Sequence, residues 1–245
     1  MSYLNTAPFV YGIKNSGILD RIELTLDYPS ECARKLLSDE SDIGLIPVAA
    51  NPRLKENHII TDYCLGAEGP VRTTILFSNC PLDSIERVYL DYQSITSVTL
   101  VKVLALHSWN IKPEWLALTP DFTLKELDPY DGIVIIGDRV FDYEPGFTYR
   151  YDLANEWIKL TDLPFVFATW TSNKPIEASL IKELNDSFRI GLNDIPAAIN
   201  YYSPKNISKQ EAEYYLTKNL SYILNQPKRE AIRLFWSLAR EFTPG

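Results

Sequence analysis

Short apolar runs alternate with amphipathic helical patterns along most of the chain, and this alternation constrains the fold more than any other feature. Between two of the apolar runs lies SECARKLLSDES (30–41), which is typical of a helix with Ser30 as its N-cap. The apolar runs themselves are typical of strands: IELTLDYP (22–29), DIGLIPVAA (42–50), VRTTILFS (71–78), RVYLDY (87–92), WLALT (115–119) and GIVIIGD (132–138). The alternation predicts an α/β fold with a largely parallel sheet.

The pattern changes after PFVFATWTS (164–172), and the rest of the chain is predicted to be helical. We expect three helices to close the chain: one over 175–192, one that starts at a capping box of Ser208 and Glu211, and one over 227–242. No flexible linker or repeat is visible in the sequence, so two domains would be joined by ordered strands. The expected crossings are near 77–86 and 160–172.

Charge and composition exclude several classes of protein. The 245 residues carry a net charge of -8, which argues against a general nucleic-acid surface. No stretch is long and apolar enough for a membrane span, and the first residues lack a secretory signal pattern, so we expect a cytoplasmic location. The three cysteines have long spacings and no CxxC, which favours reduced thiols over a disulfide framework or a zinc site.

The usual catalytic signatures are absent from the sequence. It contains no GxGxxG, GxxxxGK[ST], GxSxG or HExxH, and His58 and His107 stand alone, as structural histidines commonly do. An enzyme with this sequence would therefore have few acid-base groups.

Small polar clusters stand where predicted strands end. Ser94, Thr96 and Ser97 come after the strand at 87–92 and open a helix, where free N–H groups bind carboxylates and phosphates; ordinary N-capping is the alternative. Arg72 is the only cation in the turn GAEGPVRTT (66–74), and it could grip a carboxylate or form a surface ion pair.

Two further clusters fit the same scheme. Gly137 would permit close approach of a ligand at the end of the strand at 132–138, and Asp138 would bind there or cap the next turn of the chain. Asn5 or Thr6 can cap a helix with Pro8 in its first turn. Ligands of open α/β folds bind at the carboxyl ends of strands, so the four segments are expected to converge on one cleft.

Together these segments resemble a known family. SYLNTAPF, DIGLIPVAA, GPVRTTILFS, DYQSITSVTL, IIGD and YDLANEWIKLTDLPFVFATW are similar to motifs of the chorismate dehydratase family of the futalosine route to menaquinone, in order from residue 2 to about 172. The resemblance implies the two-lobed fold of periplasmic binding proteins of the second type. Each lobe would be a mixed sheet flanked by helices: residues 1–80 with 170–245 form one lobe, 81–169 form the other, and two hinge strands cross a ligand cleft.

The resemblance also implies an activity and a site. The family removes water from chorismate to give 3-[(1-carboxyvinyl)oxy]benzoate, without a metal or organic cofactor. Asn5 would then contact the reacting ring, and the hydroxyls near residue 94 would hold one carboxylate, while Arg72 supports the other. The remaining substrate contacts are expected from Ser2, Thr6, Gly137 and Asp138. No side chain in these motifs is a compelling general base, although a substrate carboxylate could serve.

One departure and three alternatives accompany this interpretation. Family members have an apolar strand before the SYLNT segment, whereas Met1 alone precedes it here, so we expect that the sequence begins after the first strand or that its start was assigned late. The alternatives are a solute-binding protein for a small aromatic or dicarboxylic anion, a transcription-regulator effector domain, and a 1,4-dihydroxy-6-naphthoate synthase. The last has a Ser-Pro-Cys-Pro-Asn type of opening, unlike Ser2-Tyr3-Leu4-Asn5-Thr6.

Overall fold

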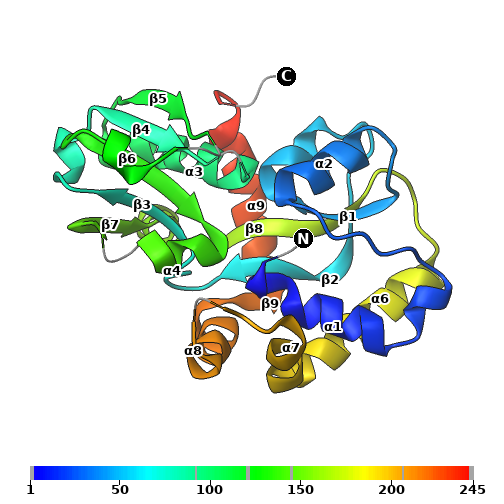
Figure 1. Ribbon diagram of the computed structural model, residues 1–245. Coiled ribbons are helices and arrows are strands. Elements are labelled where there is room, and N and C mark those ends of the chain that lie inside the picture. The colour runs from blue at the N-terminus through cyan, green and yellow to red at the C-terminus, as the bar shows by residue number, and fades with distance from the viewer. Residues whose placement is uncertain (1–2, 92, 120–121, 144–145, 206, 243–245) are drawn as a thin grey trace.

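Two β-sheets with flanking helices make up the computed structural model, which describes residues 3–91, 93–119, 122–143, 146–205 and 207–242 (Figure 1). The four-stranded sheet has the order β1-β8-β2-β9, with β1 (Ile43–Pro47), β2 (His58–Ala67), β8 (Phe165–Ser172) and β9 (Ser221–Ile223). The five-stranded sheet has the order β5-β4-β6-β3-β7, with β3 (Thr74–Ser78), β4 (Arg87–Leu90), β5 (Glu114–Ala117), β6 (Asp131–Ile136) and β7 (Tyr149–Asp152).

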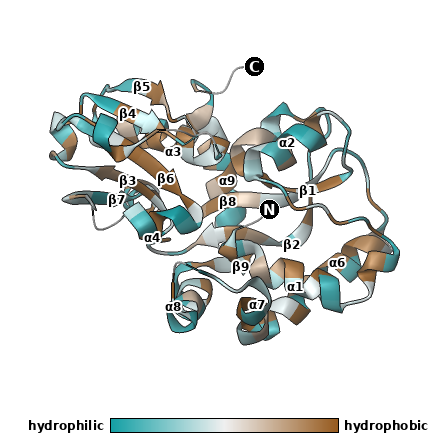
Figure 2. Ribbon diagram, in the orientation of Figure 1, coloured by the Kyte–Doolittle hydropathy of each residue, from teal (hydrophilic) through white to brown (hydrophobic). Residues whose placement is uncertain are grey.

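Helices cover both sheets. They are α1 (Ala7–Asn15), α2 (Pro29–Leu37), α3 (Ile95–Leu104), α4 (Val140–Tyr143), α5 (Leu153–Thr161), α6 (Ala178–Asn193), α7 (Ile195–Tyr202), α8 (Lys209–Tyr214) and α9 (Gln226–Ala239). Strand β6 is apolar and buried along most of its length, as expected for a strand covered on both faces (Figure 2). No helix in the described part of the chain is long and apolar enough to cross a membrane.

The sheets are mixed, so the expectation of a largely parallel sheet is wrong. Among the described strands, β4 runs parallel to β5 and β6, whereas β8 runs antiparallel to β1 and β2, and β3 runs antiparallel to β6 and β7. Strand β8 follows α5, at the point where the chain returns from the five-stranded sheet to the four-stranded sheet. A returning strand opposes the direction of its neighbours, which the local βα alternation does not reveal.

Other elements depart from the sequence prediction in specific ways. Residues 22–27 form no strand in the structure, and α2 is capped at Tyr28 with Pro29 in its first turn, so Ser30 is not the N-cap. The C-terminal part contains α6 to α9 and also the short strand β9, not helices alone. The capping box of Ser208 and Glu211 is confirmed at the start of α8.

The chain passes between the sheets at the β2–β3 and α5–β8 connections. Strand β3 pairs within the five-stranded sheet, and β8 pairs within the four-stranded sheet. The lobe boundaries at residues 80 and 170 stay a prediction, and these pairings would move both boundaries a few residues toward the N-terminus.

Helices α1 and α6 touch through their backbones. A Cβ atom at Gly12 would lie 1.9 Å from the Ser187 carbonyl oxygen, and one at Gly191 would lie 1.7 Å from the Pro8 carbonyl oxygen. Beside this contact, Phe9 packs against Phe188, with ring centroids 4.7 Å apart. The position of α1 therefore depends on two glycines that have no room for a side chain.

We predict that Gly12→Ala destabilises the protein by about 1–3 kcal/mol, because the added methyl group forces the two helices apart. Alanine is the better helix former, so helix propensity alone predicts the opposite sign. Urea unfolding measures the difference. The control is Gly69→Ala, since a Cβ at Gly69 would meet nothing within 4 Å; equal stability of the two variants would contradict the prediction.

Candidate active site

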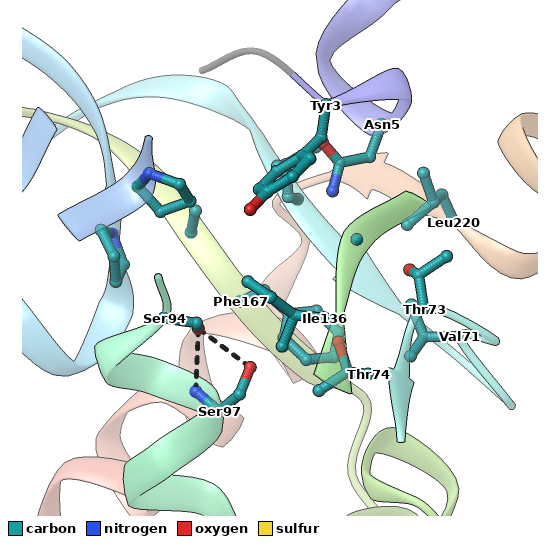
Figure 3. A pocket seen from close by; sticks show the side chains of 15 residues that line it. Tyr3, Asn5, Val71, Thr73, Thr74, Ser94, Ser97, Ile136, Phe167 and Leu220 are labelled. Carbon is teal, nitrogen blue, oxygen red and sulfur yellow. Dashed lines mark hydrogen bonds between the residues drawn. The ribbon is translucent and has the colours of Figure 1, made fainter. Parts of the chain in front are cut away.

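A small cavity with a largely apolar wall and several polar side chains lies between the two sheets, where β6, the start of α3 and the N-terminal turn meet (Figure 3). Its volume is about 50 Å³. The residues that line it come from both sheets: Tyr3, Asn5, Pro29, Pro47, Leu65, Val71, Thr73, Thr74, Ser94, Ser97, Ile136, Gly137, Phe167, Ala168 and Leu220. Of the residues predicted from the sequence, the structure brings Asn5, Ser94, Ser97 and Gly137 together here.

Asn5 lies in a single 3-10 turn, Leu4–Thr6, directly before α1. The Tyr222 hydroxyl donates to the Asn5 backbone carbonyl at 3.1 Å, which fixes the turn on β9. The side-chain oxygen of Asn5 is buried and has no hydrogen-bond partner in the described structure. A buried, unpaired amide oxygen is costly, and at the cavity wall this oxygen can accept a hydrogen bond from a bound molecule.

Ser94 and Ser97 form the first turn of α3. The Ser94 hydroxyl accepts from the backbone N–H of Ser97 at 3.1 Å and donates to the Ser97 hydroxyl oxygen at 2.9 Å. Ser94 is thus the N-cap of α3. The Ser97 hydroxyl accepts in this arrangement, and its own hydrogen, which takes no part in the two bonds, lies at the cavity wall. The positive end of α3 adds to this local preference for an anion.

Gly137 has a φ of +67°, and a Cβ atom there would lie 2.8 Å from the Tyr3 ring. This close approach requires glycine, and it lets Tyr3 reach across the cavity to donate its hydroxyl to the Gln93 side chain. Burial raises the pKa of Tyr3, so its phenol remains neutral. The hydrogen bond between Tyr3 and Gln93 joins the N-terminal segment to the loop after β4.

Asp138 makes a second bridge between the lobes. Its Oδ2 accepts from the Tyr202 hydroxyl at 2.7 Å and from the Leu4 backbone N–H at 3.2 Å, while its buried Oδ1 has no partner in the described structure. Burial raises the pKa of Asp138, and the hydrogen bonds from Tyr202 and Leu4 oppose that change. Asp138 does not line the cavity.

Asp91 is fully buried at the end of β4 and organises the same region. It accepts from the backbone N–H groups of Gln93 at 3.0 Å and Ile136 at 3.2 Å, and it pairs with Arg139. Burial still raises the pKa of Asp91 in spite of these partners. The sequence analysis missed this carboxylate, although its place at the end of a predicted strand was a usable signal.

Three other predicted residues, Thr96, Thr6 and Arg72, do not line the cavity. The Thr96 hydroxyl donates to the Phe167 carbonyl at 3.1 Å, and the Thr6 hydroxyl donates to the Tyr3 carbonyl at 2.8 Å. Arg72 has a φ of +66°, and its guanidinium lies over the Phe141 ring, at the edge of a separate cavity of about 390 Å³. Ser2 lies outside the described residues.

Two cavity residues next to Arg72 were not predicted. Thr73 and Thr74 both line the cavity, and the Thr73 hydroxyl shares a hydrogen bond of 2.7 Å with the Tyr215 hydroxyl. Burial raises the pKa of Tyr215, and hydrogen bonds from Thr73 and Asn5 oppose the rise. The two adjacent threonines after Arg72 were a visible signal, whereas nothing local marks Tyr215.

The arrangement is suited to binding an anion through neutral donors. Among the described residues that line the cavity there is no Asp, Glu, His, Lys or Arg. No group of His, Cys, Asp and Glu side chains in the described part of the chain could hold a metal ion. The site can therefore orient a ligand with hydroxyl, amide and backbone groups, while its walls provide apolar contact.

The comparisons with known proteins agree on the fold. A structure from Archaeoglobus fulgidus has a TM-score of 0.77 at 14% identity and covers 98% of this chain and 94% of that chain. The alkanesulfonate-binding protein SsuA from Xanthomonas axonopodis pv. citri has a TM-score of 0.64 at 14% identity and covers 98% of this chain and 92% of that chain. The fold and the position of the site define a two-lobed α/β protein of the periplasmic-binding-protein-like class.

Sequence comparison identifies the family within this class. A family model described as menaquinone biosynthesis matches residues 1–241. The chorismate dehydratase of Thermus thermophilus is 27% identical over 256 residues, covering 95% of this chain and 91% of that protein. The chain belongs to the menaquinone biosynthesis family.

We predict that Asp138→Asn changes the pH dependence of stability. The folded protein holds the Asp138 pKa above the unfolded value of about 4, so the free energy of unfolding falls as pH rises from there through the raised pKa. Asparagine keeps an acceptor oxygen but does not titrate. The variant should therefore gain stability relative to the parent chain between pH 4 and pH 8.

Urea unfolding at the two pH values measures this gain. Asp20→Asn serves as the control, because Asp20 is exposed. A stability difference between Asp138→Asn and the parent chain that stays constant or shrinks as pH rises would refute the assignment.

Proposed function

We infer that this protein is a chorismate dehydratase of menaquinone biosynthesis, which removes water from chorismate to give 3-[(1-carboxyvinyl)oxy]benzoate. Family membership over residues 1–241 and the chorismate dehydratase relative carry the inference. The observation in the site that best supports it is the buried, unpaired Asn5 amide oxygen in a cavity that the hydroxyls at the start of α3 also line. We place the reaction in the cytoplasm, where the protein would encounter chorismate as a soluble biosynthetic intermediate.

The reaction needs little acid-base chemistry from the protein. A base takes the proton from the ring carbon that bears the enolpyruvyl ether, the adjacent carbon loses its hydroxyl group, and proton and hydroxide leave as one water. The electron pair of the C–H bond becomes part of the aromatic ring, which provides the driving force. The protein contributes mainly by holding the substrate in the reactive orientation.

Each donor has a proposed role. The Ser97 hydroxyl and the first N–H groups of α3 bind one carboxylate, and the Asn5 amide contacts the ring near the leaving hydroxyl. The described cavity wall offers no ordinary general base, because Tyr3 is its only titratable group and burial raises the pKa of Tyr3. A carboxylate of the substrate is therefore the proposed base.

The lobes have to separate for the substrate to enter. A volume of about 50 Å³ is far below the roughly 300 Å³ of the smallest ordinary ligand pockets. The Tyr3–Gln93 and Asp138–Tyr202 hydrogen bonds cross the cleft and close it in the present structure. Chorismate would enter an open form, and closure around it would exclude water from the ring.

Incubation of the protein with chorismate tests the proposed function, with the product followed by its aromatic absorbance and its mass. Loss of 18 mass units from chorismate is the expected result. Binding of chorismate without turnover would favour the alternative of a solute-binding protein.

We predict that Asn5→Ala lowers kcat for chorismate by about 100-fold, the usual effect of removing one polar group that contacts the reacting atoms. Asn15→Ala is the matched control, since Asn15 is exposed at the end of α1 and bonds only the Tyr11 carbonyl among the described partners. Steady-state kinetics measure both variants. Unchanged turnover by Asn5→Ala would remove the proposed role of Asn5.

Ser97→Ala is expected to raise KM by about 10- to 100-fold with a smaller effect on kcat. A hydrogen bond to a charged group contributes about 1.5–3 kcal/mol, and each 1.4 kcal/mol corresponds to a factor of ten in affinity. Ser84→Ala, whose exposed hydroxyl bonds Asp83, is the control. A KM equal to that of the control would show that Ser97 does not bind the carboxylate.

A further inference from the structure

The separate cavity at Arg72, of about 390 Å³, lies at the outer edge of the five-stranded sheet, where β3 and β7 meet the start of α5 (Figure 1). We refer to it as the side cavity. It shares no lining residue with the candidate active-site cavity, and its volume is within the range of ordinary ligand pockets. Its wall includes three cations from separate parts of the chain: Arg72, Arg150 and Lys159.

Arg72 reaches the side cavity through an unusual backbone conformation. Its φ of +66° is in the left-handed region, which costs free energy for a residue with a side chain. The Arg72 backbone N–H donates to Asp152 Oδ2 at 2.7 Å, and this bond helps to hold the conformation. Thr73, the next residue, lines the candidate active-site cavity instead. Backbone strain of this kind is found at binding sites, and here it places a cation in a cavity.

The Arg72 guanidinium has no carboxylate partner among the described residues. Two acidic residues line the side cavity, and both have other partners: Asp152 caps α5, and Glu156 pairs with Lys159 at 2.6 Å. The guanidinium lies over the Phe141 ring, 5.6 Å from the ring centroid. An aromatic contact of this kind leaves guanidinium N–H groups available to a ligand.

The floor of the side cavity is apolar. Ile75 and Phe77 from β3 and Val140 from α4 line it, and all three side chains are buried. Such a surface offers no hydrogen bonds, so it favours contact with a hydrocarbon ring or chain. A ligand that fills the side cavity therefore combines an anionic group with an apolar body.

The charges of the wall favour a ligand with one negative charge. Three lining residues are cationic and two are acidic, which leaves one positive charge in excess. A phosphate with two charges would be repelled by Asp152 and Glu156. A carboxylate carries one charge, and it matches the planar guanidinium through two parallel hydrogen bonds.

We propose that the side cavity binds a small monocarboxylate with an apolar ring or chain. Arg72 holds the carboxylate, while Ile75, Phe77 and Val140 contact the apolar body. The proposal does not rest on the function proposed above, because none of these residues lines the candidate active-site cavity.

Titration of the whole chain with benzoate, followed by methyl NMR, tests the proposal. Ile75 and Val140 report on the side cavity, whereas Val71 and Ile136 report on the candidate active-site cavity. Benzoate should shift the Ile75 and Val140 methyl signals along a saturating curve, with a Kd of about 1 mM or tighter. Benzamide has nearly the same shape but no charge, so it should bind at least tenfold more weakly.

Arg72→Gln tests the residue that holds the carboxylate. Glutamine keeps a hydrogen-bonding amide but lacks the charge, so benzoate should bind this variant at least tenfold more weakly than the parent chain. Arg53→Gln is the matched control, because Arg53 is exposed and does not line the side cavity. The comparison of benzoate with benzamide needs only the parent chain, so the proposal is tested even where Arg72→Gln fails to fold.

Four results would overturn the proposal. The first is the absence of a saturating shift at Ile75 and Val140, and the second is a shift confined to Val71 and Ile136. The third is equal affinity of benzoate for Arg72→Gln and the parent chain. The fourth is tighter binding of phenyl phosphate than of benzoate. None of these readouts uses chorismate, so the proposal and the proposed function can fail independently.

Discussion

Strand β8 pairs with β1 on one side and β2 on the other, and the arrangement of both lobes depends on this pairing. The strand returns the chain from the five-stranded sheet, so it fixes how the two sheets meet. Buried Asn51 donates from its side-chain nitrogen to the hydroxyls of Thr169 at 3.2 Å and Thr171 at 2.9 Å, which secures the strand from the side. The same strand brings Phe167 and Ala168 to the wall of the cavity between the sheets.

The sequence predicted the part of the site that local patterns define. Four cavity residues, Asn5, Ser94, Ser97 and Gly137, each stand next to an apolar segment of the sequence. The expectation that ligands bind at the carboxyl ends of strands was enough to assign them to one cleft. Arg72 shows the limit of this reasoning, because its positive φ turns the side chain away toward Phe141 while Thr73 faces the cavity. A backbone conformation of that kind has no signature in a valine-arginine-threonine sequence.

In the fold, too, features set by neighbouring residues could be predicted from the sequence, whereas features set by distant residues could not. Capping at Ser208 is a local hydrogen bond, and the sequence predicted it. Strand β9 pairs with β2 and is contacted by Lys228, which is fully buried and donates to the Ile223 carbonyl at 2.7 Å and to the Ser221 hydroxyl at 2.5 Å. A lysine near the start of a helix looks like a solvated residue in sequence, so neither its burial nor the strand that it supports could be foreseen.

The contact between Gly12 and the Ser187 carbonyl also governs the placement of Asn5. Helix α1 starts directly after the turn that holds the amide, so any shift of the helix along α6 carries that turn with it. The position of the Asn5 side-chain amide thus depends on a backbone contact that lies more than one helical turn away. A glycine that does not line the cavity therefore helps to set the position of a residue that does.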